Sequence, residues 1–151
     1  MSARAPHLLL VEAPYYSHIA ALLREGAERA LAAAGATFET VQVPGAFEIP
    51  GAISIAAKAE GKFDGFVALG CVIRGETTHY DHICESTAES LQRLAVEHGL
   101  PIGYGILTCE NEAQALVRAT PGGNGRDKGG ESVRACLAMV EIKRRFAGEA
   151  G

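Results

Sequence analysis

The sequence predicts an α/β protein, a three-layer doubly wound sandwich with a four-stranded parallel sheet between its helices. Strand-like apolar runs alternate with helix-like segments four times along the chain. The third run, FVALGCVI at 66–73, is apolar or small throughout, which is typical of a strand covered on both faces of a parallel sheet. Strict alternation implies βαβ units, whose right-handed crossovers place helices on both faces of the sheet.

The first half of the chain carries two strand-helix units. Apolar residues recur at helical spacing after Ser17, and Gly35 suits the left-handed cap of that helix. The expected elements are a strand at 7–12, a helix from 17 to 35, a strand at 37–43 and, after Pro44-Gly45, a helix at 49–59. The last helix is apolar on nearly every side, so we expect its second face to meet another subunit.

The second half repeats the pattern. The expected elements are a strand at 66–73, a helix at 80–98, a strand at 101–109, a short helix at 111–119 and a last helix at 132–146. Residues 120–130, TPGGNGRDKGG, are glycine-rich and charged, and we interpret them as a loop. No repeat or long linker is visible. Since the chain has 151 residues and 48% apolar side chains, we expect one domain, residues 1–151.

Composition and charge argue against several classes of protein. No stretch approaches eighteen apolar residues and no leader sequence is visible, so we expect no membrane partner. The net charge is −4 and the one basic run is 143–145, which argues against a nucleic-acid partner. The four cysteines form no CxxC pair, which favours reduced thiols in a cytoplasm. The expected partners are small molecules or further copies of the chain.

A polar turn, RGETTH at 74–79, follows the third strand, at the edge of the sheet where ligands bind. Free N–H groups at the start of the next helix favour an anion there. The hydroxyls of Thr77 and Thr78 add donors, although both residues also fit plain helix caps. Beside an anion site, His79 is a candidate general acid or base, although alone it would be interpreted as a surface histidine.

Metal and thiol chemistry are weaker hypotheses for this turn. Histidine and acidic residues recur over 79–85, but helical ligand pairs are usually four residues apart and a third ligand is not evident. Cys71 lies within an apolar strand, where burial raises the pKa of a thiol, and Cys84 lies one turn into the helix. We interpret both cysteines as packing residues.

Aromatic and cationic residues complete the candidates. Tyr15, Phe47 and Tyr104 each follow or end a strand, so they either belong to the core or stack on a planar ring. Arg118 and Lys128 flank the glycine-rich segment. They are either solvated surface charges or, if that segment folds toward the sheet, a clamp for phosphate.

Four segments carry a family resemblance that covers nearly the whole chain. They are PGAFEIP at 44–50, GCVIRGETTHYDHIC at 70–84, PIGYGILTCENEAQA at 101–115, and Arg118 followed by DKGG at 127–130. Together they resemble the 6,7-dimethyl-8-ribityllumazine synthase family. The resemblance implies a flavodoxin-like fold and condensation of 5-amino-6-(D-ribitylamino)uracil with 3,4-dihydroxy-2-butanone 4-phosphate. The products are the lumazine, phosphate and water, and neither cofactor nor metal is implied.

The resemblance also implies a role for each candidate residue. His79 would transfer protons. The residues implied for ribitylaminouracil are Tyr15, Ala46, Phe47, Glu48, Cys71, Val72, Ile73 and, from a neighbouring subunit, Tyr104. The residues implied for butanone phosphate are Glu76, Thr77, Arg118 and Lys128.

The family assembles as rings, so we expect a homopentamer with sites between subunits. The long segment between Arg118 and Lys128 is expected to obstruct a shell of pentamers, which favours a free pentamer or a decamer. Two other functions stay open, a lumazine- or flavin-binding paralogue of low activity and the archaeal type of riboflavin synthase. The second has no phosphorylated substrate, so it would have no use for a phosphate clamp.

Overall fold

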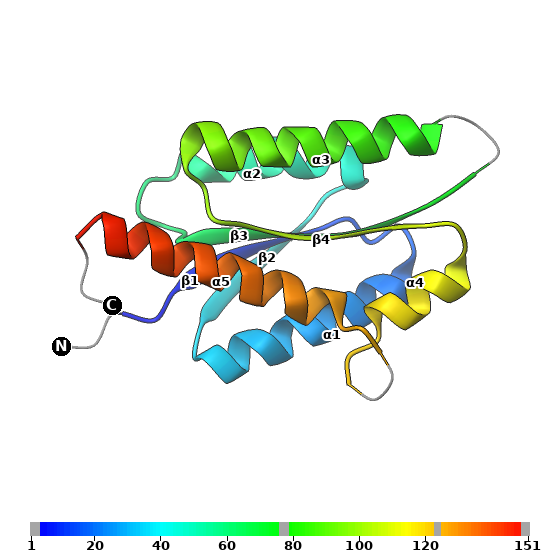
Figure 1. Ribbon diagram of the computed structural model, residues 1–151, viewed down its shortest axis with the longest axis horizontal. Coiled ribbons are helices and arrows are strands. Elements are labelled where there is room, and N and C mark those ends of the chain that lie inside the picture. Colours follow the sequence, from blue (N-terminus) through cyan, green and yellow to red (C-terminus); the bar gives the residue numbers. More distant parts are fainter. Residues whose placement is uncertain (1–3, 76–78, 123–124, 149–151) are drawn as a thin grey trace.

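The computed structural model describes residues 4–75, 79–122 and 125–148. Its elements are β1 (His7–Glu12), α1 (Ser17–Ala34), β2 (Thr37–Gln42), the 3₁₀ turn η1 (Ala46–Glu48), α2 (Ile49–Ala57), β3 (Gly65–Ile73), α3 (His79–His98), β4 (Ile102–Cys109), α4 (Glu112–Ala119) and α5 (Lys128–Phe146). The strands form one parallel sheet in the order β2-β1-β3-β4, as Figure 1 shows. The predicted fold class is confirmed.

Helices cover both faces of the sheet. In Figure 1, α2 and α3 lie above the sheet, and α1, α4 and α5 lie below it. Side chains of β1 alternate between the two layers: Leu8 and Leu10 pack in the core under α1 and α5, whereas Leu9 and Val11 pack under α2. This burial on both faces explains why the strands are continuous apolar runs rather than alternating ones.

The order of the strands creates a crevice at one end of the sheet. From β1 the chain crosses to β2 on one side, and from β2 it crosses back to β3 on the other side of β1. The connections after β1 and β3 therefore leave in opposite directions, which opens a gap beyond the carboxyl ends of these strands. Candidate residues should meet at this gap.

The last helix begins earlier than the sequence predicts. It starts at Lys128 rather than 132, because the Asp127 side chain accepts the N–H of Gly130 at 3.1 Å and caps it. Gly129 is needed for close packing rather than for a loop, since a Cβ there would lie 2.0 Å from the carbonyl oxygen of Leu23 on α1. The interpretation of 120–130 as entirely loop was therefore wrong at its end.

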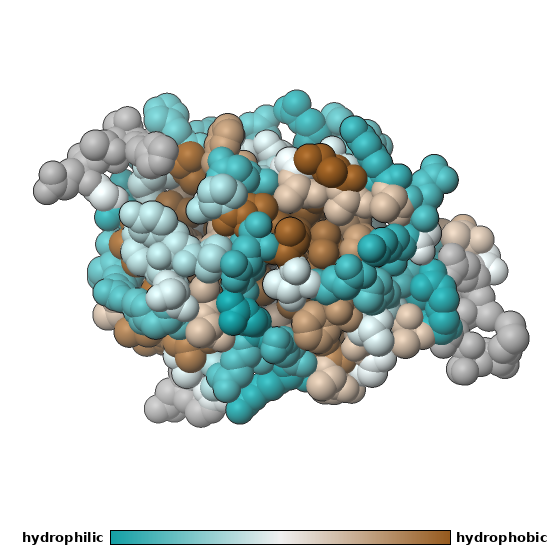
Figure 2. Space-filling model, turned by 180° about the vertical axis from the view of Figure 1, so that it is seen from behind, coloured by the Kyte–Doolittle hydropathy of each residue, from teal (hydrophilic) through white to brown (hydrophobic). Residues whose placement is uncertain are grey.

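One side of the molecule keeps apolar groups at its surface. Every residue of β2 is exposed, Phe38 and Val41 among them, and Ile55 of α2 is 73% exposed. Figure 2, which views the molecule from behind, shows hydrophobic side chains gathered among hydrophilic ones near the middle of that face. Within one chain α2 buries only Ile49 and Ile53, so its predicted contact with another subunit stays a prediction. Among the described residues, no helix is long and apolar enough to cross a membrane.

Candidate functional site

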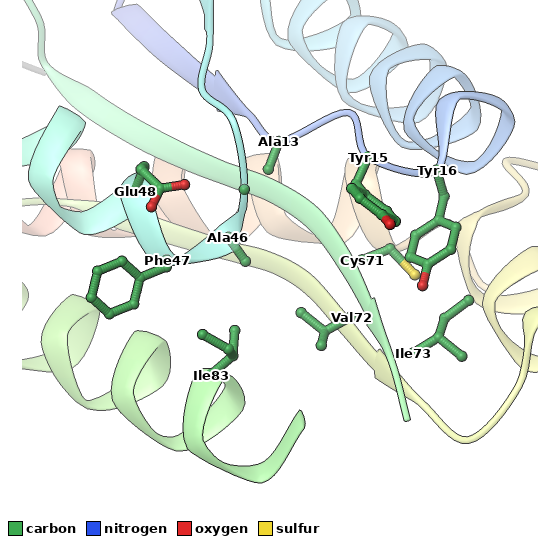
Figure 3. Close-up of a pocket in the computed structure, with 11 residues that line it drawn as sticks. Ala13, Tyr15, Tyr16, Ala46, Phe47, Glu48, Cys71, Val72, Ile73 and Ile83 are labelled. Atoms are coloured by element: carbon green, nitrogen blue, oxygen red, sulfur yellow. The ribbon is translucent and has the colours of Figure 1, made fainter. Parts of the chain in front are cut away.

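One cavity, which we call the main cavity, opens at the carboxyl ends of β1 and β3, between η1 and α3 (Figure 3). Its volume is about 660 Å³. The lining residues are Ala13, Tyr15, Tyr16, Gly45, Ala46, Phe47, Glu48, Cys71, Val72, Ile73 and Ile83. Two walls face each other across a floor formed by the end of β3, an arrangement that suits a flat ring.

Two tyrosines from the β1–α1 connection form one wall. The rings of Tyr15 and Tyr16 meet edge to face, with centroids 5.0 Å apart and planes at 75°. Tyr15 is 77% exposed, which excludes the core interpretation of that residue within one chain. Tyr16 is half-buried, and burial raises the pKa of its hydroxyl. Sequence reasoning assigned the stacking role to Tyr15 and left open the part played by Tyr16, the next residue after the same strand.

The opposite wall is η1, which supplies an aromatic ring and a carboxylate. The N–H of Glu48 donates to the carbonyl of Gly45 at 3.1 Å and closes the short turn. Phe47 is 60% exposed, so it too is not a core aromatic within one chain. In Figure 3, Phe47 and Ala46 lie on one side of the opening and the two tyrosines on the other. Stacking surfaces and a carboxylate acceptor would thus frame a bound heterocycle.

The end of β3 forms the floor and offers backbone groups. β1 pairs with β3 only as far as Leu69, whereas β4 pairs with it as far as Ile73. Residues 70–73 of β3 therefore pair with β4 on one side and have no strand partner on the side of β1. This unpaired edge faces the cavity. Unpaired backbone donors and acceptors of this kind can bind the polar edge of a ring.

Cys71 is a packing residue, as predicted. Its side chain is buried, and burial raises the pKa of the thiol to about 12. The thiol is neutral at physiological pH, so it is a poor nucleophile. Cys84 is half-buried, and burial raises the pKa of its thiol as well.

A second cavity of about 520 Å³ lies along β4, beside α4 and α5. It is lined by Tyr104, Ile106, Leu107, Thr108, Arg118, Arg126, Lys128 and Glu131. Arg118 lies in the last turn of α4, and its Nη1 donates to the carbonyl of Thr108 at 3.4 Å. Lys128 Nζ lies 3.5 Å from a carboxylate oxygen of Glu131. Three cations thus surround one opening, a combination that suits an anion.

The sequence reasoning missed one of these cations. Arg126 lines the second cavity although the sequence analysis did not select it. Its N–H donates to the carbonyl of Val117 at 2.9 Å, which brings the glycine-rich segment against α4. The available signal was a basic residue two positions before Lys128.

The turn after β3 is tied to the turn after β4 by Arg74. Its Nε donates to Glu110 at 2.8 Å, and its guanidinium lies 4.5 Å from the centroid of the Tyr80 ring. Its Nη2 also lies 3.4 Å from a carboxylate oxygen of Asp81. Arg74 therefore contacts both the residue that follows β4 and the first turn of α3.

Four of the candidate residues are not placed with the others. Glu76 and Thr77 lie outside the described residues, as does Thr78. His79 is the first residue of α3, and its side chain is likewise not described. Among the described residues, no group of three or more histidine, cysteine and acidic side chains could hold a metal ion.

The structure divides the other predicted site residues into two groups. The main cavity brings together Tyr15, Ala46, Phe47, Glu48, Cys71, Val72 and Ile73. The second cavity brings together Tyr104, Arg118 and Lys128. The two cavities share no lining residue among the described ones. A single chain therefore presents a mostly apolar opening that suits a flat ring and a separate cationic opening.

Comparisons with known proteins agree with the motifs. The family model for 6,7-dimethyl-8-ribityllumazine synthase matches residues 5–144. The chain is 50% identical over 147 residues to the 6,7-dimethyl-8-ribityllumazine synthase of Agrobacterium fabrum, with 95% of this chain and 98% of that protein covered. It is 50% identical over 140 residues to the enzyme of that name from Sphingopyxis alaskensis, with 93% and 96% covered. A protein of Rhizobium meliloti named 6,7-dimethyl-8-ribityllumazine synthase 1 is 50% identical over 149 residues, with 95% of each chain covered. The chain therefore belongs to the 6,7-dimethyl-8-ribityllumazine synthase family.

Proposed function

We propose that this protein is an enzyme that condenses 5-amino-6-(D-ribitylamino)uracil with 3,4-dihydroxy-2-butanone 4-phosphate to give 6,7-dimethyl-8-ribityllumazine, phosphate and water. The observation that carries the proposal is the pair of cavities in a chain of this family. One opening suits a planar ring with polar edges, and the other suits a phosphate. One substrate of the proposed reaction carries the planar ring, and the other carries the phosphate.

In the proposed complex the uracil ring lies in the main cavity. Phe47 and Tyr15 would cover its faces, and the free edge of β3 at 71–73 would bind its polar edge through backbone groups. Glu48 would accept hydrogen bonds from the ribityl hydroxyls. The phosphate of the second substrate would bind Arg118 and Lys128, together with the turn that contains Glu76 and Thr77.

The chemistry would need positioning and proton transfer. The primary amine of the uracil attacks the ketone, and loss of water gives an imine. Loss of a proton from the neighbouring carbon then lets the C–O bond to phosphate break, which leaves an enol that tautomerises to a ketone. The ribityl-bearing nitrogen attacks this ketone, and loss of a second water closes the second ring. Holding two substrates together makes a bimolecular step effectively intramolecular. His79 would transfer protons during these steps, with Arg118 neutralising the departing phosphate.

We further propose that the enzyme works as a ring of five subunits, alone or as a pair of rings. On one chain Tyr104, Arg118 and Lys128 lie away from the main cavity, so a complete site needs the second cavity of a neighbour. The exposed apolar groups of β2 and α2 are consistent with a covered interface. The four free cysteines favour work in a cytoplasm, where thiols stay reduced.

Incubation of the purified protein with both substrates tests the proposal. We expect a fluorescent lumazine to form together with one phosphate per product, and a mass measurement in solution to give a pentamer or decamer. Conversion of the lumazine alone into riboflavin would indicate riboflavin synthase instead. Tight binding of the lumazine with no turnover would indicate a binding protein and would overturn the proposed activity.

A further inference from the structure

A buried carboxylate belongs to the residue just before Ala13, which lines the main cavity, and it takes no part in the chemistry proposed above. Glu12 ends β1, and it is 1% exposed. By the alternation of a strand it follows Leu8 and Leu10, on the face of the sheet covered by α1 and α5. Carboxylates are almost never buried so completely unless they are paired. The complete burial of the Glu12 carboxylate therefore needs a structural explanation.

Three side-chain donors satisfy the Glu12 carboxylate. The Nε of Arg24 donates to one oxygen at 2.7 Å, and the Nη2 of the same guanidinium donates to the other oxygen. The Nε2 of Gln42 donates to that second oxygen at 3.0 Å. The hydrogen bond to Glu12 raises the pKa of Arg24, so the guanidinium stays charged. This contact links the ends of β1 and β2 to α1.

The backbone of the same residue joins both walls of the main cavity. The carbonyl of Glu12 accepts the N–H of Val43 at 2.9 Å, where the chain leaves β2 for η1. The N–H of the next residue, Ala13, donates to β3 at 2.9 Å before the chain turns into the tyrosine wall. The two walls therefore start from one point in the fold. Moving this point would change the width of the opening between Tyr15 and Phe47.

We propose that Glu12 is a positioning residue, which through Arg24 and Gln42 sets the separation of the tyrosine wall from η1 and so the fit of the ribitylaminouracil. The inference rests on the proposed function. A buried charged pair is weak as a source of stability, yet leaving either partner unpaired is strongly unfavourable. The contacts of Glu12 with Arg24 and Gln42 thus allow few alternative arrangements. They therefore fix the relative positions of the two cavity walls. A displacement of about 1 Å at a site can cost about a hundredfold in rate.

Glu12→Gln tests the inference because it keeps the size of the side chain. Its amide places an N–H group against the donors of Arg24 or Gln42, where only an acceptor fits. We expect the dissociation constant of 6,7-dimethyl-8-ribityllumazine, followed by its fluorescence, and the KM for ribitylaminouracil to rise about tenfold or more. The KM for butanone phosphate should change less than about twofold, because Arg118 and Lys128 line the other cavity.

Glu89→Gln is the matched control. It removes an exposed carboxylate from α3 rather than from β2 or α2, and Glu89 pairs there with Arg93 at 3.0 Å. We expect its lumazine affinity and both KM values to equal those of the unmodified protein. Arg24→Lys is the second variant if Glu12→Gln fails to fold, since it keeps the positive charge but loses the two-pronged contact. Arg24→Lys should also raise the dissociation constant of the lumazine, by a smaller factor than Glu12→Gln.

The outcomes separate the two proposals. If the unmodified protein makes lumazine and Glu12→Gln binds it unchanged, or Arg24→Lys does so where Glu12→Gln is insoluble, the positioning role is overturned and the activity stands. If both KM values rise equally, Glu12 supports the fold in general and the positioning role is likewise overturned. If the unmodified protein neither makes nor binds lumazine, the proposed function fails and the inference fails with it.

Discussion

The two cavities differ in nearly every physical respect. The main cavity is built from connections at the ends of β1, β2 and β3, and its lining is mostly apolar and aromatic, with one carboxylate at Glu48. The second cavity lies along the edge strand β4 and gathers Arg118, Arg126 and Lys128. An apolar cavity selects a ligand by the shape of a large contact surface, whereas a cluster of cations selects a ligand by a localised negative charge. One chain therefore carries the parts for two unlike substrates, but in places that do not coincide.

The exposure of Tyr15 and Phe47 fits this difference, because both side chains belong to the apolar cavity rather than to the core. Tyr15 and Phe47 cover little of their own chain's core, yet they stand at the mouth of the apolar opening. Tyr104 is half-buried at the other cavity, and burial raises the pKa of its hydroxyl. The proposed pentamer would bring the two kinds of surface together.

Arg118→Ala should have the largest effect. Loss of this guanidinium would weaken phosphate binding and leave the departing phosphate unneutralised, so we expect kcat/KM to fall about a thousandfold. Steady-state kinetics with both substrates measures it. Arg126→Ala is the matched control from the same cavity and should cost about tenfold or less, because it is exposed and has no described contact with α4 beyond its backbone.

His79→Ala should slow the enzyme without abolishing it. Proton transfer by a placed imidazole typically contributes about a hundredfold or more, while substrate positioning would be intact. We expect kcat to fall about a hundredfold, with KM for both substrates nearly unchanged. If His79→Ala were slower than Arg118→Ala, the ranking of charge neutralisation above proton transfer would be wrong.

Mixing the two variants tests whether one site needs two subunits. If subunits of Arg118→Ala and His79→Ala are unfolded together and reassembled at random, roughly a quarter of the sites should combine an intact main cavity with an intact neighbouring cation cavity. Activity should then recover to roughly a quarter of the unmodified level. Variants refolded separately and then mixed are the control. No recovery in the co-refolded sample would contradict sites shared between subunits.

Phe47→Leu should affect one substrate more than the other. Replacing the ring removes stacking surface from the main cavity alone, so we expect KM for ribitylaminouracil to rise about tenfold, or about 1.4 kcal/mol. KM for butanone phosphate should not follow it. Equal increases for both substrates would show that the two cavities are not independent recognition surfaces.

Cys71→Ala should have the smallest effect. The thiol has a pKa of about 12 and is neutral at the pH of the assay, so it supplies no nucleophile. We expect kcat to stay within about twofold and the pH profile to keep its shape, with a modest loss of stability from the lost packing. A large loss of kcat with an unchanged melting temperature would contradict the packing role.

Most of the fold could be predicted because the pattern of apolar residues is local. The run at 66–73 and the cap at Gly35, whose φ is 68°, were predicted from neighbouring residues alone. The start of α5 was missed because Gly129 and Gly130 favour a loop locally. Gly129 is required by the close approach of α1, a contact between residues about a hundred positions apart, whereas a Cβ at Gly130 would meet the capping side chain of Asp127. Local propensity cannot register such a contact.

From the amino-acid sequence one can predict the alternation of strands and helices, the family and the kinds of side chain that a site would contain. These are local properties, since they follow from periodicity, motif order and residue chemistry. The folded chain was needed to show that Tyr104, Arg118 and Lys128 line another cavity than Tyr15 and Phe47. It was also needed to show that Arg24 and Gln42 donate to the buried carboxylate of Glu12. Both arrangements depend on the order of the strands, and that order depends on how the crossovers pack across the whole sheet.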